Sequence, residues 1–151
     1  MNEQTESSEI PSILTNKNEA SLSLPLLPKD EYVFHVTKVT LIENKEKGSQ
    51  LIRINMKTTQ DTKDALGKQT LKAGFPQFDQ ISLTPTDNYT LEMIQRRLKQ
   101  FRAAVTGDKS NAAFFPLQQY EGQAVKVNVG ISPAKDGFEE KNNYRYIVPK
   151  D

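Results

Sequence analysis

The alternation of apolar and polar residues predicts that most of the chain after residue 30 forms β-strands. Residues 31–43 are β-branched and aromatic without a Gly or Pro, which is typical of one long strand. Residues 50–58 alternate with a period of two, which predicts a second strand. This strand places Ile52, Ile54 and Met56 on one face and Arg53, Asn55 and Lys57 on the other. We therefore expect it to have one buried face and one basic polar face.

Three more strands are expected further along the chain. Residues 69–83 indicate an interrupted, bulged strand, because Gly74 and Pro76 cannot both lie in an undisturbed central ladder. Residues 122–131 alternate again, with the apolar face formed by Val125, Val127, Val129 and Ile131. Residues 144–149 predict a short last strand that places Tyr144, Tyr146 and Val148 on one side.

Between the third and fourth strands the period changes to that of a helix. Apolar residues three and four apart form one stripe: Leu91, Ile94, Leu98, Phe101 and Val105. Asp87 or Thr90 is expected to cap the start of this helix, and Gly107 to end it in a left-handed conformation. The opposite face is basic and is expected to stay in solvent, with a second track for phosphates as the alternative; it carries Arg96, Arg97, Lys99 and Arg102.

The order of three strands, one helix and two strands predicts an all-β fold with one helix. The five-stranded Greek-key barrel called the OB-fold uses this order, with the helix covering one end of the barrel. An open α+β sandwich is the alternative architecture. Residues 29–150 are expected to form the domain. Residues 1–28 are rich in Ser, Glu and Asn and contain three prolines, which indicates a flexible, acidic N-terminal arm.

Composition excludes several kinds of chemistry. The chain has no Cys and one histidine, His35, which excludes disulfides, thiolate sites and sites that need two imidazoles. The sequence contains no Gly-rich phosphate-binding motif and no apolar run long enough to cross a bilayer. Paired carboxylates, Asp61 with Asp64 and Glu139 with Glu140, fall in loops and are expected to be solvated. We therefore expect no enzymatic activity, no cofactor, no metal site and no membrane contact.

Basic and aromatic residues interleave on the expected strands and loops. Single-stranded nucleic acid needs this combination, because cations contact its phosphates and exposed rings stack on its bases. Residues 31–151 carry 18 Lys and Arg against 14 Asp and Glu, although the whole chain has a net charge of only +1. Phe138 follows Gly137 at a turn and is the strongest stacking candidate. The residues expected to bind nucleic acid are Arg53, Lys57, Lys72, Phe75, Phe78, Lys126, Lys135, Phe138, Tyr144 and Arg145.

Four stretches carry a family resemblance: LPKDEYVFHVTKV, GSQLIRINMK, RRLKQFRAAVTG and LQQYEGQAVKVNVGISPAKDGFEEKNNYRYIVP. From residue 27 to residue 149 the sequence resembles the OB-fold single-stranded-DNA-binding proteins encoded in bacteriophage replication and recombination modules. Asp30 and Glu31 depart from the family, in which a turn glycine precedes the first strand. The resemblance implies a protein that coats single-stranded DNA during phage DNA replication and recombination, in the host cytoplasm, without catalysis or a cofactor.

Partners and rival functions follow from the charge pattern. Many single-strand binders recruit partners through an acidic C-terminal tail, so the acidic N-terminal arm is expected to recruit replication or recombination proteins here. RNA as the ligand and a homo-oligomer stay open. The alternative function is a structural or adaptor barrel, such as a virion component or protein-interaction module, whose Leu-rich arm pairs with a neighbour's sheet edge. A nuclease would need a carboxylate cluster that only folding assembles.

Overall fold

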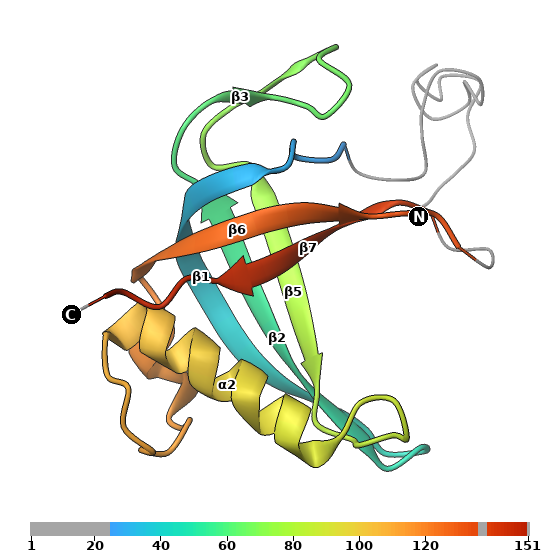
Figure 1. The fold of residues 1–151 in the computed structure, drawn as a ribbon, viewed down its shortest axis with the longest axis vertical. Helices are drawn as coiled ribbons and strands as arrows, with labels where there is room; N and C mark the ends of the chain where they lie inside the picture. Colours follow the sequence, from blue (N-terminus) through green and yellow to red (C-terminus); the bar gives the residue numbers. More distant parts are fainter. Residues whose placement is uncertain (1–24, 136–138, 151) are drawn as a thin grey trace, which may run out of the picture.

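An antiparallel sheet and one α-helix make up the folded body of a computed structural model of the chain, which describes residues 25–135 and 139–150 (Figure 1). The five-stranded sheet has the order β5-β2-β1-β6-β7. Its strands are β1 (Asp30–Asn44), β2 (Ser49–Thr58), β5 (Pro76–Ser82), β6 (Ala124–Ser132) and β7 (Lys141–Tyr146). The helix of the described residues is α2 (Leu91–Thr106). The expectation of a mostly β fold with one helix is confirmed for this part of the chain.

The first strand, β1, is long enough to pair with two neighbours. Its first half, from Asp30 to His35, pairs with β6, and its second half, from Phe34 to Asn44, pairs with β2. The register shifts between Val36 and Lys38, and a bulge of this kind bends a strand. The sheet therefore curls, and in Figure 1 β6 and β7 run across the direction of β2 and β5.

The expected third strand is divided into two short pieces that belong to different sheets. Its first part is β4 (Thr70–Leu71), which pairs with β3 (Thr62–Lys63) in a small separate hairpin. The chain then turns at Gly74, whose φ of 90° favours glycine, and the Gly74 N–H donates to the Thr58 carbonyl at 2.8 Å. The predicted interruption is thus correct, but the prediction of one bulged strand over residues 69–83 is wrong.

Both ends of α2 are capped as expected, while its buried face differs from the predicted stripe. The Thr90 hydroxyl accepts from the Met93 N–H at 3.3 Å, and Gly107 ends the helix with a φ of 78°. Ile94 and Phe101 are buried, but Leu91 is 56% exposed. Ala103 and Ala104 are buried instead. The segment after the helix folds back on α2, so a second side of the helix is covered.

Two expected boundaries differ from the structure, one of a strand and one of the N-terminal arm. The last strand begins at Lys141 rather than at residue 144 and ends at Tyr146. Residues 25–28 belong to the folded body rather than to the arm, since Leu27 is fully buried. The Leu27 N–H donates to Asn142 Oδ1, and Asn142 Nδ2 donates to the Leu27 carbonyl, both at 2.9 Å. Residues 1–24, to which the arm prediction otherwise applies, lie outside the described residues.

The hydrophobic core lies between the inward face of the curled sheet and α2. The Phe101 ring is fully buried and contacts the Tyr120 ring of the 3-10 helix η1 (Leu117–Tyr120) at 5.1 Å and the Tyr146 ring at 4.8 Å. The sheet contributes Phe34, Val36, Val39, Ile52, Ile54, Met56, Ile81, Val125, Val127 and Val129. None of the helices described is long and apolar enough to span a membrane.

Candidate nucleic-acid interface

The outward face of β2 and β5 brings three of the predicted binding residues together. In the antiparallel register Arg53 lies opposite Gln80, Asn55 opposite Phe78, and Lys57 opposite Pro76. Residues directly opposite each other share one face of a sheet. The alternate positions on β2, which include Ile52 and Ile54, are buried. Arg53, Lys57 and Phe78 therefore share the solvent side, as the alternation of residues 50–58 predicts for the two cations.

The centre of this face is a contact between Arg53 and Phe78. The Arg53 guanidinium lies over the Phe78 ring, 4.3 Å from its centroid, and the ring is 43% exposed. A guanidinium over a ring is attracted by the negative face of the π-system, which holds both side chains in one arrangement on the sheet surface. Asn55 and Gln80 beside them add amide groups that donate and accept hydrogen bonds.

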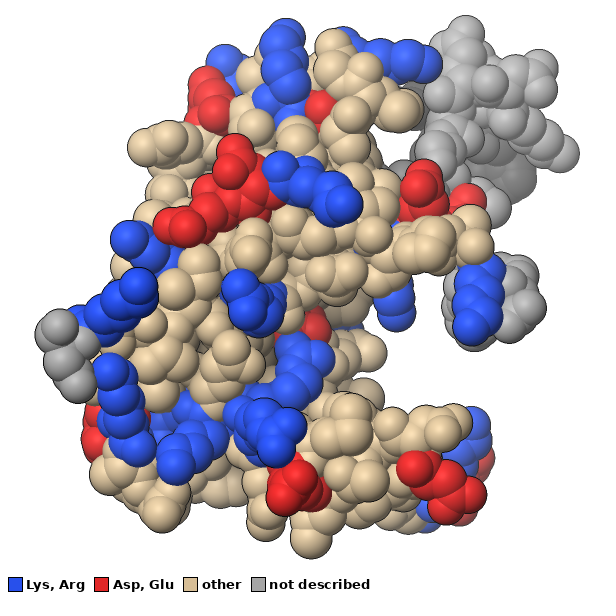
Figure 2. Space-filling view, viewed as in Figure 1, with Lys and Arg blue, Asp and Glu red and all other residues tan. Residues whose placement is uncertain are grey.

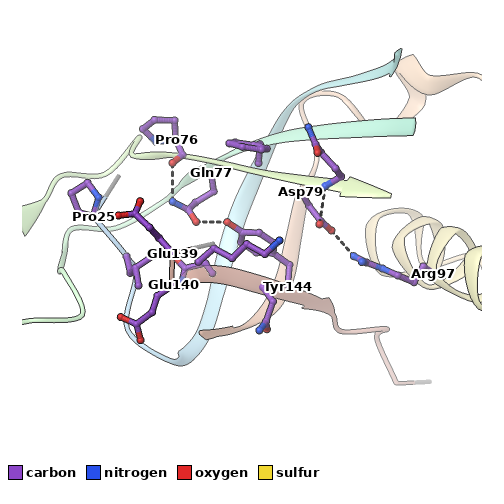
Figure 3. Close-up of a pocket in the computed structure, with 14 residues that line it drawn as sticks. Pro25, Pro76, Gln77, Asp79, Arg97, Glu139, Glu140 and Tyr144 are labelled. Carbon is purple, nitrogen blue, oxygen red and sulfur yellow. Dashed lines mark hydrogen bonds and ion pairs between the residues drawn. The ribbon is translucent and has the colours of Figure 1, made fainter. Parts of the chain in front are cut away.

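A groove of about 620 Å³ lies next to Phe78, between the two edge strands β5 and β7 (Figure 3). We call it the sheet-edge groove. Gln77 and Asp79 of β5 lie along one side, Arg97 of α2 lies at one end, and Tyr144 of β7 lies on the other side. The remaining lining residues are Pro25, Leu26, Pro76, Phe78, Gln80, Glu139, Glu140, Lys141, Asn142 and Asn143.

Side chains join the two edge strands across this groove. The Tyr144 hydroxyl donates to Gln77 Oε1, and the Tyr146 hydroxyl donates to Asp79 Oδ2 at 2.7 Å. The Arg97 guanidinium donates to the same Asp79 oxygen. Burial, and after it the Asp79 carboxylate, raises the pKa of Tyr144 and of Tyr146 well above its usual value. Both tyrosines are therefore neutral hydrogen-bond donors, and they connect strands that share no backbone ladder in the described residues.

The charges in the sheet-edge groove are mixed, which limits what it can bind. Its lining contains two cations, Arg97 and Lys141, and three carboxylates, Asp79, Glu139 and Glu140. The Asp79 and Arg97 side chains bond to each other. Carboxylates repel phosphate, so the groove interior is a poor phosphate site. The cations on the adjacent outward face, Arg53 and Lys57, are better placed to contact a polyanion that runs along the groove rim.

Two predicted aromatic residues face the interior instead of solvent. Phe75 and Tyr144 are half-buried and pack against the core. The Tyr144 ring lies 6.3 Å from the buried Phe34 ring in an edge-on contact. Among the predicted rings in the described residues, only Phe78 is exposed. Phe138 lies outside the described residues.

The other predicted cations lie away from the Arg53 and Phe78 contact. Lys72 precedes β5, and its Nζ lies 3.6 Å from Asp61 Oδ2. Lys126 is on β6, and its Nζ lies 4.0 Å from Oε2 of Glu31 on β1. Arg145 is exposed on β7 opposite Asn128, and Lys135 is exposed after β6. Lys126 and Arg145 are thus on the outward face of β6 and β7, at the opposite edge of the sheet order from β5.

Several polar residues have structural roles that the sequence pattern did not reveal. Arg97 was expected in solvent but bonds to Asp79, and Arg102 was expected in solvent but its side chain is only 11% exposed. Asp64 was expected to be solvated but is buried, where its carboxylate accepts from the Lys68 N–H at 2.7 Å. The His35 ring Nε2 lies 2.9 Å from the Gly122 carbonyl. The alternation of residues 76–82 would have indicated that Gln80 shares a face with Phe78.

The described residues contain no cluster of three or more His, Cys, Asp or Glu side chains that could hold a metal ion. No protein-family model and no curated protein matches this chain.

Proposed function

We propose that this protein is a single-stranded-DNA-binding protein that coats DNA during phage DNA replication and recombination, without catalysis. The proposal includes the finer fold: an OB barrel, in which β5 and β7 are the strands that close the cylinder. Two observations support the closure, namely the Tyr144 bond to Gln77 and the Tyr146 bond to Asp79 across the gap. The position of α2 between the third and fourth long strands supports the OB topology.

The single observation that carries the function is the exposed Phe78 ring with the Arg53 guanidinium over its face. A base that stacks on this pair adds a third layer to it. In single-strand binding, bases stack both on aromatic rings and on guanidinium planes. Arg53 and Lys57 contact the flanking phosphates, and Asn55 and Gln80 meet base edges. Because every base has a π-face, such a site tolerates many sequences.

The remaining predicted residues extend this interface. Lys126, Lys135 and Arg145 add positive charge on the β6 and β7 side and support the grip on phosphates further along the strand. Phe138 stays a stacking prediction. The acidic N-terminal segment, residues 1–24, remains the proposed contact for replication or recombination proteins.

A fluorescence-anisotropy titration with labelled oligo-dT tests the proposal. We expect Phe78→Ala to weaken binding by about 1 to 3 kcal/mol, or roughly 5- to 150-fold, since this is what one stacked base contributes. Leu66→Ala is the matched control, because Leu66 is 75% exposed at the tip of the β3 and β4 hairpin and its loss removes apolar surface elsewhere. Its affinity should equal that of the wild type.

A second arm of the titration compares single-stranded with double-stranded DNA at two salt concentrations. Single-strand affinity should fall steeply with salt, and the fall should be less steep in Arg53→Gln, which loses one phosphate contact. Equal affinity for the duplex, or a Phe78→Ala variant that binds like Leu66→Ala, contradicts the proposal. A wild-type protein that binds neither DNA nor RNA leaves the adaptor barrel as the function.

A further inference from the structure

A second groove, of about 660 Å³, runs along the other side of α2. We call it the helix groove. One wall is the solvent side of α2, and the opposite wall is the loop of residues 110–114. The lining residues are Glu92, Gln95, Arg96, Leu98, Lys99, Arg102, Ser110, Asn111, Ala112 and Phe114.

The helix groove is preformed, because hydrogen bonds hold its loop against α2. Arg102 Nε donates to the Ala113 carbonyl at 3.1 Å, and its guanidinium forms an ion pair of 3.0 Å with Asp108. Lys99 Nζ donates to Asn111 Oδ1 at 2.7 Å. A ligand therefore meets an ordered wall and does not bear the conformational entropy cost of ordering the loop.

The lining of the helix groove is strongly cationic. It has three cations, Arg96, Lys99 and Arg102, and one carboxylate, Glu92. Figure 2 shows Lys and Arg side chains gathered over α2, with few acidic side chains among them. The Arg96 and Glu92 side chains are 71% and 80% exposed and lie 3.3 Å apart. An exposed pair of this kind has little net stability, so an incoming phosphate readily takes the place of Glu92.

The helix groove and the proposed DNA-binding face are neighbours across α2. Arg97 lines the sheet-edge groove, whereas Arg96, the preceding residue, lines the helix groove. Successive helical side chains are separated by about 100° around the axis, so α2 is a ridge with one cation on each flank. A strand that leaves Phe78 along the rim of the sheet-edge groove reaches the helix groove by crossing this ridge.

We propose that the helix groove is a second phosphodiester-binding site, which holds the continuation of the single strand bound at Arg53 and Phe78. Arg96 and Lys99 contact the phosphates, while Arg102 holds the wall. The Phe114 ring lines the groove, and the adjoining Phe115 is 54% exposed, so a base that turns toward the loop meets an aromatic surface. The inference rests on the proposed function, since it assigns a longer path to the same ligand.

The test compares two lengths of oligo-dT in the full-length protein. A strand of about 8 nucleotides is short enough for one site, and one of about 30 nucleotides is long enough for both. Arg96→Gln with Lys99→Gln removes two exposed cations and the Lys99 bond to Asn111, and leaves the Arg102 bonds to the loop intact. Asn111→Ala removes the same bond without changing the charge, so it separates the two effects. The matched control is Lys63→Gln with Lys68→Gln, which removes two exposed cations from the β3 and β4 hairpin at the far end of the molecule (Figure 1).

For the long strand we expect the Arg96 and Lys99 double variant to lower the salt slope by about 1.4, because each contact with a single-strand phosphate contributes about 0.7. The same two contacts amount to a loss of roughly 25-fold in affinity near 0.1 M salt. The short strand should lose much less, and the control should retain wild-type affinity for both lengths. The long strand, but not the short one, should protect Lys99 from acetylation, with Lys68 as the unprotected reference.

Three results overturn the inference. The first is a double variant that binds the long strand like the control, while Phe78→Ala still weakens binding; this leaves the proposed function standing. The second is a wild-type protein that binds no single strand, which removes both proposals. In the third, a synthetic peptide of residues 1–24 binds the wild type but not the Arg96 and Lys99 double variant, while both proteins bind the long strand with the same affinity. This result assigns the groove to an acidic peptide.

Discussion

The two grooves beside α2 are similar in volume, about 620 and 660 Å³, but their charged side chains do different things. In the sheet-edge groove the Asp79 carboxylate accepts from both the Arg97 guanidinium and the Tyr146 hydroxyl, and the Tyr146 bond joins the two edge strands. In the helix groove Arg96 is exposed and forms its ion pair with Glu92, which is exposed as well. Arg97 in one groove thus serves the fold, whereas Arg96 in the other is available to a ligand.

The comparison teaches that neighbouring residues of the same type can have opposite roles. Arg96 and Arg97 both fall on the polar side of the helical pattern, and both were expected in solvent. The Arg97 side chain is 33% exposed, against 71% for Arg96, because the edge strand β5 places Asp79 within its reach. Position on a helix wheel therefore does not decide whether a cation is structural.

The largest expected effect comes from breaking the sheet-edge network. Asp79→Ala leaves the Arg97 guanidinium and the buried Tyr146 hydroxyl without their acceptor. We expect the free energy of unfolding to fall by about 3 kcal/mol, the lower end of the range for a buried charged pair, because Arg97 keeps part of its hydration. Urea denaturation followed by circular dichroism measures this.

The matched control for Asp79 is Glu92→Ala in the helix groove. Its ion pair with Arg96 is exposed and joins positions four apart on one helix. Its removal should change the free energy of unfolding by less than about 0.5 kcal/mol. Equal losses in the two variants would show that the two grooves do not differ as described. Asp79→Asn, which keeps an oxygen acceptor for Tyr146, should fall between them.

The second effect concerns the wall of the helix groove. Arg102→Gln removes the ion pair with Asp108 and the bond to the Ala113 carbonyl. We expect a loss of about 1 to 2 kcal/mol, because hydrogen bonds to a charged, largely buried group are lost. Amide hydrogen exchange over residues 108–113 should rise more than exchange in β5 or β7. Arg96→Gln should leave the exchange of this loop unchanged.

Most of the fold could be predicted from local patterns, and its long-range contacts could not. The alternation in β2 and β6 and the left-handed end at Gly107 are local, so the sequence identified them, and it gave Thr90 as one of two candidate caps. The division of the third strand was missed because Gly74 indicates a break without revealing that β4 pairs with β3. Leu27 was placed in the arm because its partner, Asn142, is distant in the sequence.

The candidate site was predictable to the same extent. Alternation placed Arg53 and Lys57 on one face, and the structure brings them beside the exposed Phe78. The alternation alone could not decide which of Phe75, Phe78 and Tyr144 is exposed, because the direction of each ring depends on which strand face meets the core. The basic face of α2 was predictable from the helical pattern, but the wall that makes it a groove was not. The loop after Gly107 returns to α2 through the Arg102 and Lys99 bonds, which no periodic pattern shows.

The smallest effect, a dependence on pH, distinguishes the helix groove further. The Ser110 backbone N–H, then the Ser110 hydroxyl and Arg102, lowers the pKa of Asp108 from 3.8 to about 2. Because the folded pKa lies below the ordinary value, the ionised carboxylate stabilises the loop above about pH 4, and this contribution is lost as the pH falls through 2. Asp108→Asn should therefore destabilise the loop at neutral pH and match the wild type in hydrogen exchange below pH 2.

An NMR titration of the Asp108 carboxyl carbon measures this pKa directly. In Arg102→Gln the pKa should rise but remain below 3.8, because the Ser110 N–H, 2.9 Å from Asp108 Oδ1, has the largest influence and is still present. A pKa that returns to 3.8 in this variant would mean that Arg102 alone orders the loop. A pKa unchanged in this variant would mean that the loop is held at Ser110 without Arg102, and the helix groove would then keep its wall even when its buried cation is lost.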